Sequence, residues 1–236
     1  MSSLPQDFIF RFSFPCREYQ EVPKRLSAEF LKEEYRFPYW NHRELTSKFS
    51  EAEPNSQKKE LKTREQSPFV FDFRMAWHIK GLFLTVVLSG KKAPLFCDRS
   101  KLELSDSLQV CLDMRDVRDV HRGSRFCHKL LFLPNASSSK VISPTAYWLP
   151  IHRAKAHPNP VDVSRFLLAS NVTSNGYQLS VYIPGETLTG YDPKEHSRLG
   201  FHFSLLDNEL GHFSLQHSNL LPVDEDPSLW SVLELV

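Results

Sequence analysis

The sequence predicts an all-β fold, specifically a jelly-roll-like (immunoglobulin-like) β-sandwich with little helix. The first observation behind this prediction is a succession of short segments in which apolar side chains alternate with polar ones, the pattern of a half-buried strand. The second is the presence of 16 prolines, which interrupt long helices and favour loops and strand ends. Hydrophobic residues make up 41% of the 236 residues, so the chain can bury a substantial core.

The N-terminal region is expected to begin with a strand and continue into a helix. Residues 7–14 place a phenylalanine at every second position from the second residue of the segment, which is the period of a strand. Residues 24–35 are predicted to form a short helix, because Leu26, Phe30 and Leu31 would fall on one of its sides.

The main succession of strands occupies the rest of the chain. Residues 69–79 and 82–88 are expected to form a hairpin, because the first alternates apolar with polar side chains and Lys80-Gly81 between the two suits a tight turn. Residues 134–160 are rich in serine and proline and are expected to form a long connection. The other expected strands are residues 107–112, 126–133, 166–169, 177–183, 199–206 and 231–235.

Charge and apolar patterning narrow the classes of partner. The formal net charge is +1, which gives no global attraction to nucleic acid or to an anionic membrane, so neither is expected as a partner. The first residues lack the basic and apolar regions of a signal peptide. No segment reaches the roughly 18 consecutive apolar residues of a membrane span. A cytoplasmic location is therefore expected.

The thiol groups show no metal-binding or redox pattern. No two cysteines have the close C-x-x-C spacing of such sites, and most have apolar neighbours, which is typical of reduced, buried thiols. A disulfide remains the alternative. His121, Cys127 and His128 could supply zinc ligands, but their spacing fits no zinc motif, so no metal site is expected here. The four cysteines are Cys16, Cys97, Cys111 and Cys127.

The segment around residues 115–125 is dense in basic side chains and forms the first candidate ligand site. Guanidinium groups match the geometry of carboxylates and phosphates, so this segment could hold an anion or a sugar acid. The alternative is a solvated loop in which the arginines pair with Asp116 and Asp119. The candidate ligand-binding residues are Arg115, Arg118, His121, Arg122 and Arg125.

Aromatic pairs outside the strand pattern form the second candidate site. Tyr147-Trp148 lies in the proline-flanked connection, where it could either cover the open end of the sandwich or offer a flat stacking face to a ligand. The same alternatives apply to Phe37, Tyr39 and Trp40. We include Tyr147 and Trp148 among the candidate ligand-binding residues.

Catalytic motifs are absent from the sequence. It contains no nucleophile elbow, phosphate-binding loop, dinucleotide fingerprint or H-E-x-x-H pair. Asp106 and Asp113 stand seven residues apart on an expected strand, or roughly 23 Å. Paired glycosidase carboxylates lie at most about 9.5 Å apart. We therefore expect no catalytic residues and no enzymatic activity.

Three strand motifs occur in an order that resembles a known family. They are Asp106-Ser-Leu-Gln-Val-Cys-Leu-Asp113, Gly176-Tyr-Gln-Leu-Ser-Val-Tyr-Ile-Pro184 and Leu199-Gly-Phe-His-Phe-Ser-Leu-Leu-Asp207. In this order they resemble the strands of family 9 carbohydrate-binding modules and the related DOMON-like sandwiches. The resemblance covers about residues 69–236. Residues 1–68, which include the polar segment 41–67, are interpreted as an added strand and polar loop of the same domain.

The resemblance implies a non-catalytic sandwich that binds sugar ends between aromatic rings, in many members with a structural calcium ion. Oxygen ligands for calcium could come from Asp207, Asp224 and Asp226. Apart from that implied ion, no cofactor is expected. Leu102 and Leu104 occupy the approach to the Asp106 strand, where the family carries a stacking aromatic residue.

The sequence thus favours a non-catalytic module that binds a carbohydrate or another small ligand. Its expected partner is a saccharide or a small anionic molecule, held by the basic residues of segment 115–125 and by Tyr147 or Trp148. The alternative is a structural or protein-interaction domain that keeps the sandwich without binding sugar, in which case the partner is an unidentified protein. A large exposed apolar patch without a concave pocket would favour that alternative.

Overall fold

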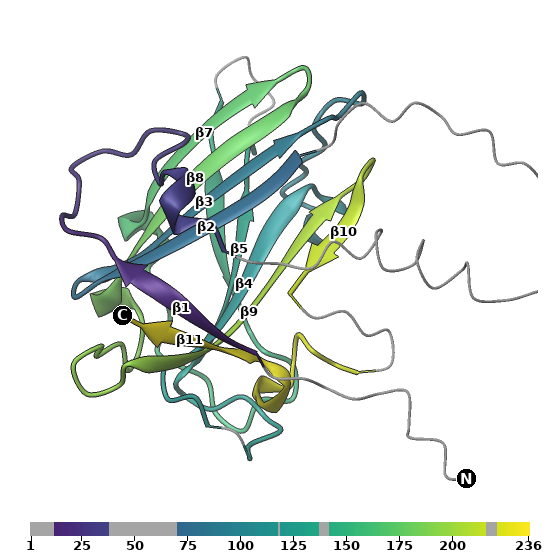
Figure 1. The fold of residues 1–236 in the computed structure, drawn as a ribbon. Coiled ribbons are helices and arrows are strands. Elements are labelled where there is room, and N and C mark those ends of the chain that lie inside the picture. Colours follow the sequence, from purple (N-terminus) through teal and green to yellow (C-terminus); the bar gives the residue numbers. More distant parts are fainter. Residues whose placement is uncertain (1–11, 38–69, 118, 137–141, 216–220) are drawn as a thin grey trace, which may run out of the picture.

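A computed structural model describes residues 12–37, 70–117, 119–136, 142–215 and 221–236, and shows a nearly all-β protein (Figure 1). The strands are β1 Ser13–Glu18, β2 Val70–His78, β3 Gly81–Ser89, β4 Ser107–Asp113, β5 Cys127–Leu133, β6 Thr145–Leu149, β7 Leu167–Thr173, β8 Gly176–Pro184, β9 Arg198–Asp207, β10 Gly211–Ser214 and β11 Ser231–Leu235. Short 3-10 turns are η1 Glu33–Tyr35, η3 Leu102–Leu104, η4 Val163–Arg165, η5 Gly185–Thr187 and η6 Pro227–Leu229. The predicted all-β class with little helix is confirmed, and the jelly-roll arrangement stays a prediction.

One continuous, barrel-like sheet contains all the described strands. Its order is β6-β5-β4-β9-β11-β1-β2-β3-β8-β7, and β10 pairs with β9 outside this path. Strand β1 joins the two halves of the sheet, because residues 13–16 pair with β11 and residues 17–18 pair with β2, both in parallel. The two halves therefore face each other across a shared interior, as Figure 1 shows.

The main hydrophobic core fills the space between the two halves. Phe73 from β2 stacks on Phe203 from β9, with ring centroids 4.3 Å apart, and Phe37 packs edge-on against Phe201. On β4, Leu108 and Val110 are fully buried in the same cluster. Alternation on facing strands thus places one set of side chains in the core and leaves the opposite set on the outer faces.

The helix predicted for residues 24–35 is wrong. The chain there runs as an irregular strap over the outer face of β3 and β8, with only the 3-10 turn η1. The backbone N–H of Leu31 donates to the Thr85 hydroxyl at 3.1 Å, and that of Phe30 donates to the Ser180 hydroxyl at 3.0 Å. Side chains of the sheet thus satisfy strap amides that a helix would have used internally.

Other strands differ from prediction in extent. The connection predicted over residues 134–160 contains β6, and the short strand β10 was not predicted. The N-terminal strand was expected over residues 7–14, but β1 covers Ser13–Glu18. Residues 7–11 lie outside the described part of the chain, as do Tyr39, Trp40 and the segment 41–67.

The four cysteines are free thiols, as the sequence favoured, and the alternative of a disulfide is excluded. Cys16, Cys111 and Cys127 are buried and Cys97 is half-buried, where desolvation raises the pKa of its thiol to about 11. Within the described residues, no helix has the length and apolar character needed to cross a membrane. The cytoplasmic location stays a prediction.

Candidate functional site

The outer face of the β6-β5-β4-β9-β10 half is built by the alternation of these strands. On β4, Leu108 and Val110 point into the core, so Ser107 and Gln109 point outward. Register then decides which neighbours share the outer face. Gln109 lies between Leu131 of β5 and Ser204 of β9.

One end of this outer face is covered by the segment that precedes β11. Trp230 is fully buried there, and its indole Nε1 donates to the carbonyl of Val223 at 2.7 Å. The side chains of Cys111 and Cys127 from the sheet pack into the same cluster with Ile151. This cluster, which we call the Trp230 cover, packs over the end of the face near Cys127 and leaves the other end open.

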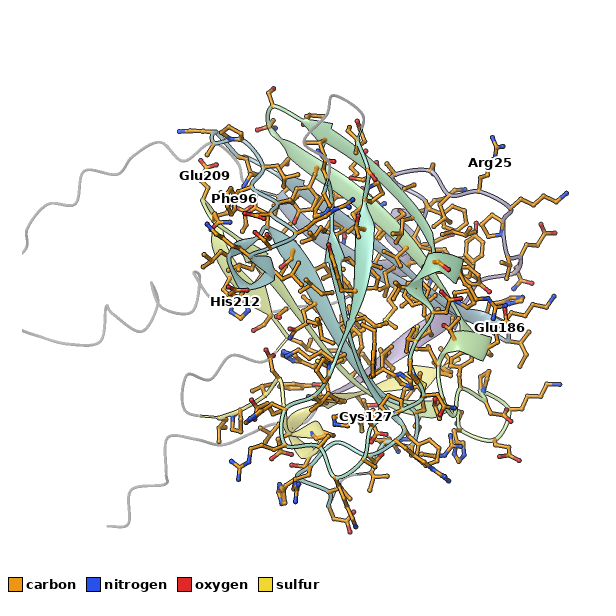
Figure 2. The ribbon with its side chains drawn as sticks, turned by 180° about the vertical axis from the view of Figure 1, so that it is seen from behind. Arg25, Phe96, Cys127, Glu186, Glu209 and His212 are labelled. Carbon is orange, nitrogen blue, oxygen red and sulfur yellow. The ribbon has the colours of Figure 1, made fainter. Side chains whose placement is uncertain are left out.

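The open end forms a groove with a volume of about 500 Å³, which we call the open-face groove. This volume falls within the range of about 300–1,000 Å³ that small-molecule sites occupy. His212 of β10 lies on this side, well separated from Cys127 in Figure 2. The groove is lined by Leu102, Glu103, Ser107, Gln109, Lys129, Leu131, Leu149, Ser204, Leu206, His212 and Asp224.

Polar groups gather at the boundary between the open-face groove and the Trp230 cover. Lys129 Nζ lies 3.5 Å from Asp224 Oδ2. Desolvation opposes ionisation of Asp224, but the adjacent Gln109 amide and the Lys129 ammonium lower the pKa of this carboxyl below its ordinary value. Gln109 Nε2 is buried and makes no hydrogen bond of ordinary geometry to any described residue. The groove therefore offers a cation, an anion and a buried amide donor within one small area.

A buried histidine on the same outer face lies beside this polar area. His202 of β9 is 2% exposed, and its Nε2 lies 4.0 Å from Asp224 Oδ1. Desolvation lowers the pKa of His202 to about 4, so the ring is neutral at pH 7. Because the ring does not carry charge, the Lys129–Asp224 pair remains close to balanced.

The two residues of the predicted aromatic pair lie next to each other on strand β6 and therefore point to opposite faces of the sheet. Tyr147 lies opposite Leu131, a lining residue, and therefore shares the groove side of the sheet. Trp148 lies opposite Leu130 and packs against the main core. The structure thus brings Tyr147 to the edge of the open-face groove and places Trp148 in a packing role.

The predicted basic segment is held mainly by contacts within the protein. Arg115 Nη1 donates to the carbonyls of Gly190 at 2.6 Å and Met114 at 3.1 Å. The guanidinium groups of Arg115 and Arg125 both lie over the ring of Phe126, at 4.4 and 4.8 Å from its centroid. These hydrogen bonds and ring contacts occupy the guanidinium groups that would otherwise bind a ligand.

The remaining members of the basic segment also have partners, or are not described. Arg122 Nε donates to the carbonyl of Arg153 at 2.7 Å. His121 Nδ1 lies 3.1 Å from Asp226 Oδ2. Arg118 lies outside the described residues. Tyr147 pairs with Leu131 of β5, which lies four residues, or about 13 Å, beyond the first residue of that strand. The basic segment precedes β5, so the aromatic pair and the basic segment do not meet at the sheet. Ligand binding by the basic segment stays a prediction.

The residues proposed as calcium ligands do not fit a calcium site. Asp207 is bound by Lys91, Asp224 faces Lys129, and Asp226 caps η6 through the N–H of Ser228. Among the described residues, no group of three or more His, Cys, Asp and Glu side chains gathers where it could hold a metal ion. The implied calcium therefore has no site built from these three aspartates.

The groove residues were largely missed by sequence reasoning. Gln109 carried a signal, because it is the central polar side chain of a strand with one apolar face. Lys129 carried a similar one as a lone charge within the apolar segment of β5. The sequence around Gln109 and Lys129 does not predict which end of the outer face is covered by the Trp230 cover.

Solved structures of carbohydrate-binding modules share this fold. A family 9 carbohydrate-binding module from Caldicellulosiruptor kristjanssonii in complex with cellotriose is 14% identical, with a TM-score of 0.57 over 94% of this chain and 93% of that chain. A family 9 module from the same organism in complex with glucose gives 14% identity and a TM-score of 0.57 over 95% of each chain. A candidate carbohydrate-binding protein from Bacteroides uniformis ATCC 8492 is 9% identical, with a TM-score of 0.53 over 96% of this chain and 100% of that chain.

These matches confirm the predicted resemblance at the level of the fold, which is that of family 9 carbohydrate-binding modules. No protein-family model matches the sequence, and no curated protein matches it. The resemblance to DOMON-like sandwiches stays a prediction.

Proposed function

We propose that this chain is a non-catalytic module that binds a saccharide in the open-face groove. The observation that carries the proposal is the groove itself, a concave site of about 500 Å³ with Gln109, Lys129 and Asp224 at its polar end. Its setting supports the same function, because the fold is shared with modules solved in complex with glucose and with cellotriose.

The chemistry of the lining suits sugar hydroxyl groups. Each hydroxyl both donates and accepts a hydrogen bond, and the groove supplies a donor in Lys129, an acceptor in Asp224 and both in Gln109. Four leucine side chains, Leu102, Leu131, Leu149 and Leu206, also line the groove and would contact the C–H faces of a sugar ring. Tyr147 at the groove edge is the aromatic ring best placed to extend this apolar contact.

Charge favours a neutral saccharide over an anionic ligand. Lys129 is paired with Asp224, and Glu103 adds a further carboxylate to the lining. An anion would meet two carboxylates for one ammonium group. Small anionic ligands belong instead to the separate prediction for the basic segment.

The alternative, a protein-interaction domain, is less well supported. Within the part of the chain that the structure describes, the large exposed apolar side chains are scattered along the sequence, and a concave polar groove is present. These features are the opposite of the flat apolar patch that the alternative predicts.

Isothermal titration calorimetry with glucose and cellotriose tests both candidate sites on one protein. We expect wild type to bind, Gln109→Ala and Lys129→Ala to lose at least tenfold in affinity, and Arg122→Ala to bind as wild type. Loss in Arg122→Ala alone would move the site to the basic segment. No binding by folded wild type to these sugars or to a wider saccharide panel would refute the proposed function.

A further inference from the structure

A lysine side chain lies between two carboxylates in the interior of the protein. Lys91 follows β3, and the backbone N–H groups of Gly90 and Lys91 both donate to the carbonyl of Asn175, at 2.9 and 3.0 Å. Gly90 has a φ of 100°, a conformation that favours glycine. This turn is tied to the β7–β8 connection, and the side chain of Lys91 is only 2% exposed.

The ammonium group bridges the start of β4 and the end of β9. Lys91 Nζ donates to Asp106 Oδ2 at 3.1 Å and to Asp207 Oδ2 at 2.5 Å. Both aspartate side chains are fully buried. Three charged groups thus lie together without water access, and neither carboxylate could remain there as an anion without the cation.

The second oxygen of each carboxylate holds a loop. Asp106 Oδ1 accepts the backbone N–H of Asn208 at 2.8 Å. Asp207 Oδ1 accepts the backbone N–H groups of Glu209 at 3.0 Å and Leu210 at 2.7 Å. One cationic centre with two carboxylates that organise surrounding backbone is the arrangement that a structural metal ion commonly provides.

We propose that the ammonium group of Lys91 performs the structural role of a bound cation between Asp106 and Asp207, so that this fold needs no divalent metal. The proposal accounts for the misfit of the implied calcium, because Asp207 is already neutralised from within the chain. It is independent of sugar binding, since the cluster shares no residue with the open-face groove.

The ionisation of the cluster agrees with this role. Burial opposes the charge of Lys91, but hydrogen bonding to Asp207 and the charge of Asp106 hold the pKa of the ammonium above its ordinary value. Burial, followed by the two aspartates, raises the pKa of nearby Tyr177 well above its ordinary value. The tyrosine is therefore a neutral hydroxyl. Lys91 is the cation between the two carboxylates, which also accept backbone N–H groups from Phe96, Asn208, Glu209 and Leu210.

Thermal unfolding with and without calcium tests the proposal. Wild type should have the same melting temperature in EDTA and in millimolar CaCl₂. Lys91→Ala leaves two buried carboxylates facing a space, and should lower the melting temperature by roughly 6–20 °C in EDTA. Added CaCl₂ should recover part of that loss, because carboxylate oxygens are the ligands that calcium prefers.

Two further variants act as controls. Lys91→Met fills the space without a charge, so it should be destabilised and show no response to calcium. Lys92→Ala, at the adjacent exposed lysine, should behave as wild type. A melting temperature of wild type that falls in EDTA or rises in CaCl₂ would overturn the proposal, and this measurement stands even if Lys91→Ala does not fold. Equal stability of Lys91→Ala and Lys92→Ala would overturn it too.

Discussion

The hydroxyl of Thr85 lies 2.8 Å from the hydroxyl of Ser180, and this pair fastens the N-terminal strap to the sheet. The Ser180 hydroxyl donates to the carbonyl of Ala28 at 2.9 Å. Its single hydrogen is thereby used, so Thr85 is the donor within the pair. Both hydroxyl oxygens in turn accept strap amides, from Phe30 and Leu31. Two small polar side chains therefore satisfy three backbone groups of the strap, the N–H groups of Phe30 and Leu31 and the carbonyl of Ala28.

Replacing Thr85 with valine should destabilise the protein by about 1–3 kcal/mol. The substitution keeps the side-chain shape but leaves the N–H of Leu31 buried without its acceptor, and Leu31 is fully buried. Denaturant unfolding measures the loss. Trypsin should also cleave faster after Lys24 and Arg25, which lie in the strap.

The matched control for this prediction is Thr173→Val. Thr173 is an exposed residue of β7, and its hydroxyl donates to the carbonyl of Gly176 at 3.3 Å and accepts the N–H of Asn175 at 3.3 Å. Water can replace both bonds at this exposed position, so the change in unfolding free energy should stay within about 0.5 kcal/mol. Similar losses for both variants would show that the Thr85–Ser180 pair does not fasten the strap.

A second prediction concerns the Trp230 cover. Trp230→Phe removes the indole N–H that donates to Val223 and leaves that carbonyl buried without its partner. We expect a loss of about 1–3 kcal/mol in the free energy of unfolding, measured by denaturant. Trp77→Phe is the control, because Trp77 Nε1 donates to the carbonyl of the exposed Val236 at 3.1 Å. A loss in Trp77→Phe as large as in Trp230→Phe would contradict the importance of burial.

The strand pattern was predictable because most strands carry their own signal. In β2, β3, β8 and β9, apolar residues recur along the whole length of the strand, and the expected bounds differ from the observed ones by only a few residues. Strand β6 lacked such a signal, because it has five residues between prolines and is ordered by pairing with β5. The incorrect prediction of a helix over residues 24–35 has the same cause, because contacts with residues distant in sequence decide the structure there. Its apolar spacing fits a helix, but Thr85 and Ser180, distant in sequence, capture the backbone.

The candidate site was harder to predict because its position depends on which parts of the outer faces of the sheet are covered by other segments. Alternation in β4 and β5 shows that Gln109 and Lys129 point away from the core, but both outer faces of the barrel-like sheet carry such residues. One face is covered by the strap, and one end of the other by the Trp230 cover. The groove is the part of the outer face that these segments, distant in sequence, do not cover. A dense run of arginines was the stronger local signal, yet many of its contacts serve to hold its own loop.

The last prediction concerns acid sensitivity and rests on His128. This residue is fully buried opposite Leu112, with Nε2 3.2 Å from the carbonyl oxygen of Thr189. Desolvation lowers the pKa of His128 to about 4, below the ordinary value of 6.5. Between these two values the unfolded chain binds a proton that the folded chain does not. The stabilising contribution is therefore complete above pH 6.5 and is lost as the pH falls toward 4.

The size of this contribution is about 3 kcal/mol, since each pKa unit corresponds to about 1.4 kcal/mol. Denaturant unfolding between pH 4 and pH 7 should show a steep loss in wild type and a loss smaller by about that amount in His128→Gln. His202, with its pKa also lowered to about 4 by burial, accounts for part of the remaining slope. His157→Gln, at an exposed histidine, should keep the wild-type slope. If His128→Gln keeps that slope as well, the buried ring of His128 is not the group that makes the fold acid-sensitive.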